Sequence, residues 1–135
     1  MASDKAPNFA EGYEFPDAQK EVVEAVEAIE QGDLLKVTNT NAGGQHIVGK
    51  HTAATPCRYV ALHDAEAGKK TVVLRQGTTK VTFGSDVTVG ESCKAKAGKI
   101  VASGTAASSG LCGVIISNGN NDGDTGLIYF NGVMS

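Results

Sequence analysis

Three histidines and a cysteine are the residues of this chain whose types could hold a metal ion. His46, His51 and His63 lie on either side of Cys57 in the sequence. Zinc sites use imidazole and thiolate ligands at short, regular spacings. These four residues match no such spacing, and the expected strands and loops separate them. The sequence therefore favours surface or solvated histidines over a metal site.

A second group of oxygen-bearing side chains alternates further along the chain. Asn118, Asn120, Asp122 and Asp124 follow one another at every second position, as ligands do in a calcium loop. Such a loop ends in a glutamate that binds the ion through both oxygens, and Tyr129 stands at that distance here. A plain hairpin tip is the better interpretation.

Two lysines on a strand-like segment raise the possibility of a carrier function. Cys93-Lys94-Ala95-Lys96 is similar to the hairpin that bears the modified lysine of biotinyl and lipoyl carrier domains, which are also small duplicated β-structures. The methionine or acidic residues that usually flank that lysine are missing. Two solvated lysines are the main interpretation, and a small β carrier or ligand-binding domain stays as an alternative.

Nucleophilic catalysis has little support. Serines are numerous, but none occupies a Gly-x-Ser-x-Gly elbow, which exposes a nucleophile between a strand and a helix. The small-residue stretch 106–110 has no phosphate-binding glycine pattern around it. We expect neither an enzyme nor a bound cofactor.

The cysteines are expected to be buried free thiols. There are three of them, Cys57, Cys93 and Cys112, an odd number without metal-ligand spacing. Cys93 and Cys112 lie in strand-like stretches, where a small apolar side chain would serve equally well.

Length and composition limit the chain to one small domain, with or without a tail. Its 135 residues include 17 glycines and only 5% aromatic residues, which suits a turn-rich β-structure. The net charge of −3 and the lack of a basic run argue against nucleic-acid binding through phosphates. No apolar run approaches a membrane span, and the first residues lack the apolar stretch of a signal peptide. We therefore expect synthesis in the cytoplasm, and neither nucleic acid nor membrane as a partner.

The pattern of turns and apolar runs predicts a duplicated β-unit, with repeats at about residues 29–77 and 87–132. Equivalent positions lie about 54–58 residues apart and occur in the same order. The equivalent turns are Gly32-Asp33 and Gly90-Glu91, Gly44 and Gly98, and Gly68 and Gly123. The equivalent apolar runs are 59–62 and 113–116, and 72–77 and 127–132.

Apolar residues alternate with polar ones along short stretches that end at glycine, which predicts antiparallel strands. The stretch around Cys93 shows this most fully: Val87 and Val89 are expected on one face, and Cys93, Ala95 and Ala97 share a face further on. The other expected strands are 34–40, 45–49, 57–63, 71–76, 79–83, 99–103, 111–117 and 126–130, with 71–76 and 79–83 forming a hairpin about Gly77. Together they predict an all-β fold, a small barrel or sandwich.

The segment 21–31 allows two interpretations. Val22, Val26 and Ile29 fit one face of a helix. The duplication instead pairs this segment with the strand-like residues 80–83, so extended structure is favoured by a small margin.

Residues 1–20 are expected to form an extended N-terminal arm before a β-domain at 21–135. The arm has no sustained periodicity, yet it carries Phe9, Tyr13 and Phe15. Aromatic side chains in a segment without its own core usually pack on another surface. These three residues are therefore the candidates for an interface with a capsid or a neighbouring subunit; folding back onto the domain's own β-structure is the alternative.

The order of these turns and strands resembles that of the head decoration, or capsid cement, proteins of tailed bacteriophages. The resemblance rests on the stretches 29–36 and 59–68 in the first unit, and on 87–91, 98–101, 113–116 and the final strand in the second. It covers about residues 28–132 and consists of strands and turns without a catalytic signature.

The resemblance implies a structural protein on the outside of an assembled virion. Its partner would be the major capsid protein, and members of the family commonly stand as homotrimers at three-fold positions. A carrier or ligand-binding domain, and another adhesive virion module, are the alternatives.

Overall fold

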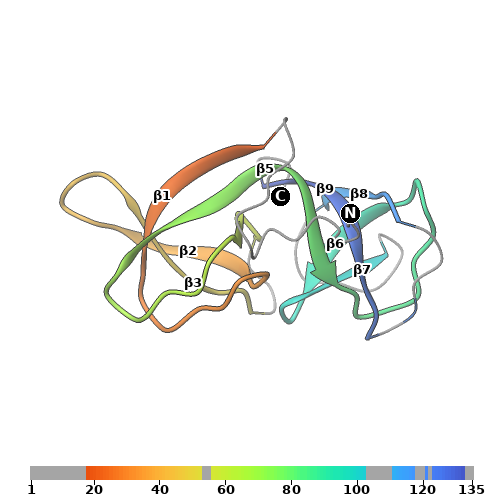
Figure 1. Ribbon diagram of the computed structural model, residues 1–135, viewed down its shortest axis with the longest axis horizontal. Helices are drawn as coiled ribbons and strands as arrows, with labels where there is room; N and C mark the ends of the chain where they lie inside the picture. The colour runs from red at the N-terminus through yellow and green to blue at the C-terminus, as the bar shows by residue number, and fades with distance from the viewer. Residues whose placement is uncertain (1–17, 53–55, 103–110, 118–120, 122, 133–135) are drawn as a thin grey trace, which may run out of the picture.

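The protein is described by a computed structural model over residues 18–52, 56–102, 111–117, 121 and 123–132 (Figure 1). Its regular structure in these ranges is entirely β, which confirms the predicted fold class. The described part of the chain has no helix that could cross a membrane. The strands are β1 (Gln19–Ala25), β2 (Leu34–Thr40), β3 (His46–Lys50), β4 (Tyr59–Ala61), β5 (Lys70–Thr82), β6 (Ser92–Lys96), β7 (Lys99–Ala102), β8 (Leu111–Ile115) and β9 (Thr125–Asn131).

The strands form one continuous sheet that is folded into two barrels sharing β5, of which the second is closed only by an isolated parallel bridge between Phe83 and Ile100. The strand order is β1-β3-β2-β4-β5-β9-β8-β6-β7. An additional antiparallel pairing of β1 with β5 closes the first five strands into a barrel. In Figure 1 these strands lie to one side, β6 to β9 lie to the other, and β5 runs across both.

The second unit repeats the pairings of the first. In the first, β2 pairs with β3 and β4, and β4 pairs with β5. In the second, β6 pairs with β7 and β8, and β8 pairs with β9. The parallel pairing of β1 with β3 has its counterpart in a parallel bridge between Phe83 and Ile100. The predicted duplication is therefore present in the topology.

Equivalent turns also carry equivalent hydrogen bonds. The backbone N–H of Gly32 donates to the Ala61 carbonyl at 2.7 Å, and that of Gly90 donates to the Ile115 carbonyl at 2.9 Å. Both glycines have a positive φ, 90° and 86°, a conformation that costs glycine little because it has no Cβ. The turns 30–33 and 88–91 are each closed by an acidic side chain that accepts a backbone N–H three residues earlier. Because these requirements act over a few neighbouring residues, the repeat can be recognised in the sequence.

Strand β5 contradicts the predicted hairpin about Gly77. The chain does not turn there: β5 continues for 13 residues, from Lys70 to Thr82. Before Gly77 the strand pairs with β1 and β4, and from Gln76 onward it pairs with β9. Gly77 has a φ of 143°, and the Cα of Ala18 lies 3.0 Å from the place a Cβ would occupy. The glycine therefore marks a close approach of two backbones and a change of strand partner.

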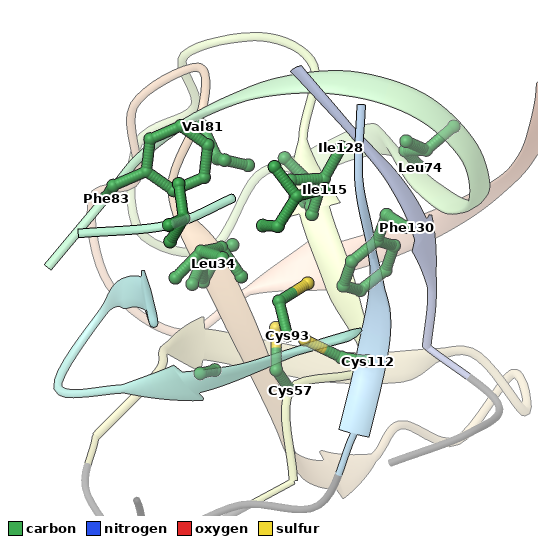
Figure 2. Close-up of a cluster of buried hydrophobic side chains, with 14 of the residues drawn as sticks. Leu34, Cys57, Leu74, Val81, Phe83, Cys93, Cys112, Ile115, Ile128 and Phe130 are labelled. Carbon is green, nitrogen blue, oxygen red and sulfur yellow. The ribbon is translucent and has the colours of Figure 1, made fainter. Parts of the chain in front are cut away.

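Two hydrophobic clusters fill the molecule. The smaller lies inside the first barrel and consists of Val23, Ala25, Ile29, Leu35, Val48, Tyr59, Ala61 and Val73. The larger belongs mainly to the second unit and includes Phe83, Ile100, Ile115, Ile128 and Phe130 (Figure 2). First-barrel residues Leu34, Val60, Leu62 and Leu74 also belong to the larger cluster. The two barrels are thus joined by shared apolar packing as well as by β5.

The segment 21–31 is mainly extended, as the duplication indicated. Strand β1 ends at Ala25, and Ile29 forms a bridge with Ala65. The strand begins at Gln19, so it includes the last two residues of the expected arm. Val26, expected on the buried face of a possible helix, is 52% exposed.

Val87 and Val89 do not share a face, contrary to expectation. Val87 is buried, whereas Val89 is 46% exposed, and neither lies in a strand. The Glu91 N–H donates to the Thr88 carbonyl, which places Val89 in the turn. Ala97 is also outside the predicted alternation, because it forms the β6–β7 turn with a φ of 49°. The direction of these side chains is set by the geometry of the turns, which an alternating sequence pattern does not describe.

Candidate functional site

The structure gives each histidine different surroundings. His46, on β3, is half-buried and lies against Tyr59. His51 is buried, and its Nδ1 lies 3.3 Å from the backbone nitrogen of Gly98, which donates to it. His63 is exposed in the turn after β4. Among the described residues, no group of three or more histidine, cysteine or acidic side chains is arranged to hold a metal.

The three cysteines converge in the larger core, as Figure 2 shows. All three are free and buried, which confirms their predicted state. Burial raises the pKa of the Cys57 thiol, and hydrogen bonding to Cys112 together with burial raises the pKa of Cys93. Hydrogen bonds from Cys57 and Cys93 lower the pKa of Cys112. The raised pKa values keep Cys57 and Cys93 protonated at neutral pH, and burial shields all three sulfur atoms from reagents. The cluster is best understood as core packing.

The lysines considered for a carrier function lie on β6 and not at a hairpin tip. Cys93 and Ala95 point into the core, and the intervening Lys94 and the following Lys96 lie towards solvent. The tip of the β6–β7 hairpin is formed by Ala97 and Gly98. This placement does not match the position of a carrier lysine.

The alternating residues near 120 fall only partly within the described ranges. Asn118, Asn120 and Asp122 lie outside them. The Oδ2 of Asp124 accepts a hydrogen bond of 2.8 Å from the Asn121 N–H. That bond closes the turn before β9 in the manner of Asp33 and Glu91, so this carboxylate has a structural task. The interface candidates Phe9, Tyr13 and Phe15 also lie outside the described residues.

A pocket that the sequence did not indicate lies on the first barrel. It has a volume of about 470 Å³ and is lined by Glu21, Val37, His46, Arg58, Tyr59, Arg75 and Gly132. Strands β1, β2, β3, β4 and β5 contribute to it, together with the residues just before β4 and after β9. Residues from all five strands of the first barrel thus meet Gly132, at the end of the second repeat.

Tyr59 lines this pocket beside His46 and Glu21. The Nδ1 of His46 is 2.7 Å from the Tyr59 hydroxyl oxygen and 3.5 Å from the Glu21 Oε2. Burial, followed by hydrogen bonding to Glu21, raises the pKa of Tyr59 well above its usual value. The hydroxyl therefore remains neutral and can donate a hydrogen bond. Glu21 interacts with His46 and Tyr59.

Two arginines form the other wall, and both are tied to backbone or amide groups. An Arg58 terminal nitrogen (Nη1) donates to the Gly132 carbonyl at 3.3 Å, and the Gly132 N–H donates to the Arg75 carbonyl at 3.0 Å. An Arg75 terminal nitrogen (Nη2) donates to the Gln19 Oε1 at 2.6 Å. Gly132 fits between them because a Cβ there would collide with the Arg58 carbonyl. The pocket is therefore a shaped, partly positive hollow.

The fold has a counterpart among solved structures. It is similar to the N base of the head fiber gp8.5 of bacteriophage phi29, with a TM-score of 0.63 and 18% sequence identity. The alignment covers 85% of this chain and 95% of the phage protein fragment. No protein-family model and no curated protein sequence matches the chain. At this level of identity the likeness establishes a shared fold.

One feature of the sequence points to the pocket. Arg58 and Arg75 are the only arginines in the chain, beside ten lysines. Arginine is preferred over lysine where a planar anion is bound through two hydrogen bonds. Their positions around two neighbouring strands would have suggested a common location.

Proposed function

We propose that this protein is a structural component of a bacteriophage virion that binds the outside of the assembled capsid and stabilises it. The observation that carries the proposal is the fold shared with the phi29 head fiber base over 85% of the chain. The resemblance of the turns and strands to capsid cement proteins points to the same location. The proposed partner is the major capsid protein, and the proposed activity is non-enzymatic.

The architecture suits a static attachment role. The two barrels share β5 and a common apolar cluster, so a force on one is transmitted through covalent and packed connections to the other. Protein interiors are close-packed and have low compressibility, which allows them to carry strain. A protein that reinforces a shell against internal pressure requires this property.

We further propose that the protein acts as a homotrimer at three-fold positions of the shell. A 13.8 kDa domain has a limited core, and association would bury additional apolar surface. Exposed apolar side chains on the second barrel, Val114 and Ile116 among them, are available for such contacts. Mass photometry of protein released from heads should give the mass of three chains, and a uniform dimer would contradict this arrangement.

The test of the proposed function is binding to heads assembled without this protein. Purified heads of the source phage, lacking the protein, are mixed with it and separated by sedimentation. We expect saturable co-sedimentation and greater resistance of the decorated heads to heat or chelator. Protein that stays in the supernatant at saturating concentration would refute the proposal. Disassembled capsid subunits serve as the control, because a decoration protein should prefer the assembled lattice.

A further inference from the structure

The two arginines of this chain lie in one pocket. The sequence has 12 basic residues, of which ten are lysines spread over many positions and two are Arg58 and Arg75. These two arginines come from segments 17 positions apart, yet both line the pocket on the first barrel. The protein as a whole carries a net charge of −3, so the two arginines are opposite in sign to the net charge of the chain.

The guanidinium groups are held in place without being neutralised. Arg58 donates to the Gly132 carbonyl and Arg75 to the Gln19 amide oxygen, both uncharged acceptors. Within the described residues, neither arginine forms an ion pair with a carboxylate. Glu21, the acidic residue of the pocket, lies instead beside His46 and accepts a hydrogen bond from Tyr59. Each arginine has five N–H donors, so several remain for a ligand.

We infer that this pocket binds the carboxylate of an acidic side chain presented by a protein partner. A planar carboxylate matches the fork of a guanidinium group and can accept two parallel hydrogen bonds from it. Among the lysine, arginine and acidic side chains that line the pocket, two arginines and one glutamate leave a single net positive charge. One carboxylate balances that charge, whereas a phosphate dianion would exceed it.

The inference deepens the proposed function and rests on it for the identity of the partner. Arginine is enriched and lysine depleted at protein interfaces, in line with the choice of residues here. The capsid surface that contacts this barrel would then present an aspartate or glutamate to Arg58 and Arg75. Carboxylate binding by the pocket and binding of the protein to the capsid are measured separately. One of the two proposals can therefore be refuted while the other holds.

The pocket is tested by nuclear magnetic resonance on protein labelled with nitrogen-15. The chain has two arginines, so its spectrum contains only two arginine Nε–Hε signals. A triglutamate peptide blocked at both ends is titrated into the full-length protein at neutral pH. We expect both signals to shift in a saturable manner, with His46 and Tyr59 affected and the lysines of β6 unaffected. Shifts spread over the lysines, or larger arginine shifts with inorganic phosphate than with peptide, would overturn the inference.

Variants separate the guanidinium fork from simple charge. R58Q/R75Q should weaken peptide affinity about tenfold or more, equivalent to about 1.4 kcal/mol. R58K/R75K keeps the charge but loses the fork, and it should also bind more weakly than the unmodified protein. K94Q, on the outer face of the other barrel, is the matched control and should bind normally. Unchanged affinity in R58K/R75K would show that a fork is not used and would overturn the inference.

The same variants distinguish this inference from the proposed function. Loss of head binding in R58Q/R75Q, but not in K94Q, would support both. If the unmodified protein binds the peptide but not the heads, the proposed function is refuted, whereas carboxylate binding by the pocket is supported. Head binding that is equally tight in R58Q/R75Q would overturn the pocket as the capsid contact.

Discussion

His46 and Tyr59 are joined side chain to side chain, with the imidazole Nδ1 2.7 Å from the phenolic oxygen. They come from β3 and β4, which do not pair with each other but both pair with β2. The contact therefore spans the middle strand of the first barrel. It also connects the Tyr59 hydroxyl to His46, whose Nδ1 lies 3.5 Å from the Glu21 Oε2.

This arrangement predicts a stability change at alkaline pH. The folded-state pKa of Tyr59 is raised above the unfolded value of about 10. The folded protein therefore retains a proton that the unfolded chain loses, and the free energy of unfolding falls as the pH rises above about 10. Below that pH the contribution is fully present. Tyrosinate absorbance should show a phase well above pH 10 that Y59F removes.

Chemical denaturation supplies the control for this prediction. The loss of unfolding free energy between pH 9 and pH 11 should be smaller in Y59F than in the unmodified protein. Y129F, which lacks the other described tyrosine hydroxyl, should keep the full loss. An identical alkaline loss in Y59F and the unmodified protein would contradict the raised pKa.

Gly113 should tolerate no side chain. A Cβ at this position would collide with the Tyr129 carbonyl oxygen on the neighbouring strand β9. Because backbone atoms cannot rotate away, G113A should lower the free energy of unfolding by about 1–3 kcal/mol, the usual cost of overpacking. Gly43 offers the matched control, since its nearest neighbour would be the Asn41 side chain at 3.5 Å. Urea denaturation of both variants checks this; equal stability would contradict the tight β8–β9 contact.

The thiols should be unreactive in the folded protein. All three cysteines are buried in the larger core, so a thiol reagent reaches none of them while the core stays closed. This includes Cys112, whose pKa is lowered by hydrogen bonds from Cys57 and Cys93. Ellman's reagent should therefore give no rapid reaction with native protein and three equivalents after guanidinium denaturation. C57A should lower the denatured value to two. Rapid labelling of the native protein would show that the core opens to solvent or that a cysteine lies outside it.

The sequence predicted the repeat because its signals are local. Gly32 and Gly90 have a positive φ, and each precedes an acidic residue that closes its turn, so both the glycine and the carboxylate are required at fixed spacing. Strand β2 was predicted with its observed bounds, Leu34–Thr40, for the same reason: a turn stands at each end.

Two features depend on contacts between distant segments and could not be found in this way. Gly77 resembles a turn glycine in sequence, but its role is set by Ala18, which lies almost 60 positions earlier. The pocket joins Glu21 to Gly132, so no window of the sequence contains it. Periodicity describes the faces of a strand, whereas these features depend on which strands become neighbours.

The N-terminal arm should contribute to attachment more than to folding. Deletion of residues 1–16 removes Phe9, Tyr13 and Phe15, and burying one such side chain is worth about 1.5–3 kcal/mol. If the arm packs on the capsid or a neighbouring subunit, the deletion leaves the melting temperature nearly unchanged and weakens binding to undecorated heads. The triple variant F9A/Y13A/F15A, with the chain length kept, is the matched control. A large loss of thermal stability with head binding intact would place these aromatic side chains in the domain's own core.

Electron microscopy of the native particle tests the central claim most directly. A reconstruction of the source phage head should show density for this double barrel on the outer surface of the shell, in groups of three at three-fold positions. The pocket containing Arg58 and Arg75 should face an acidic side chain of the major capsid protein. An outer surface with no such density, or the protein located in the tail or inside the shell, would contradict the account.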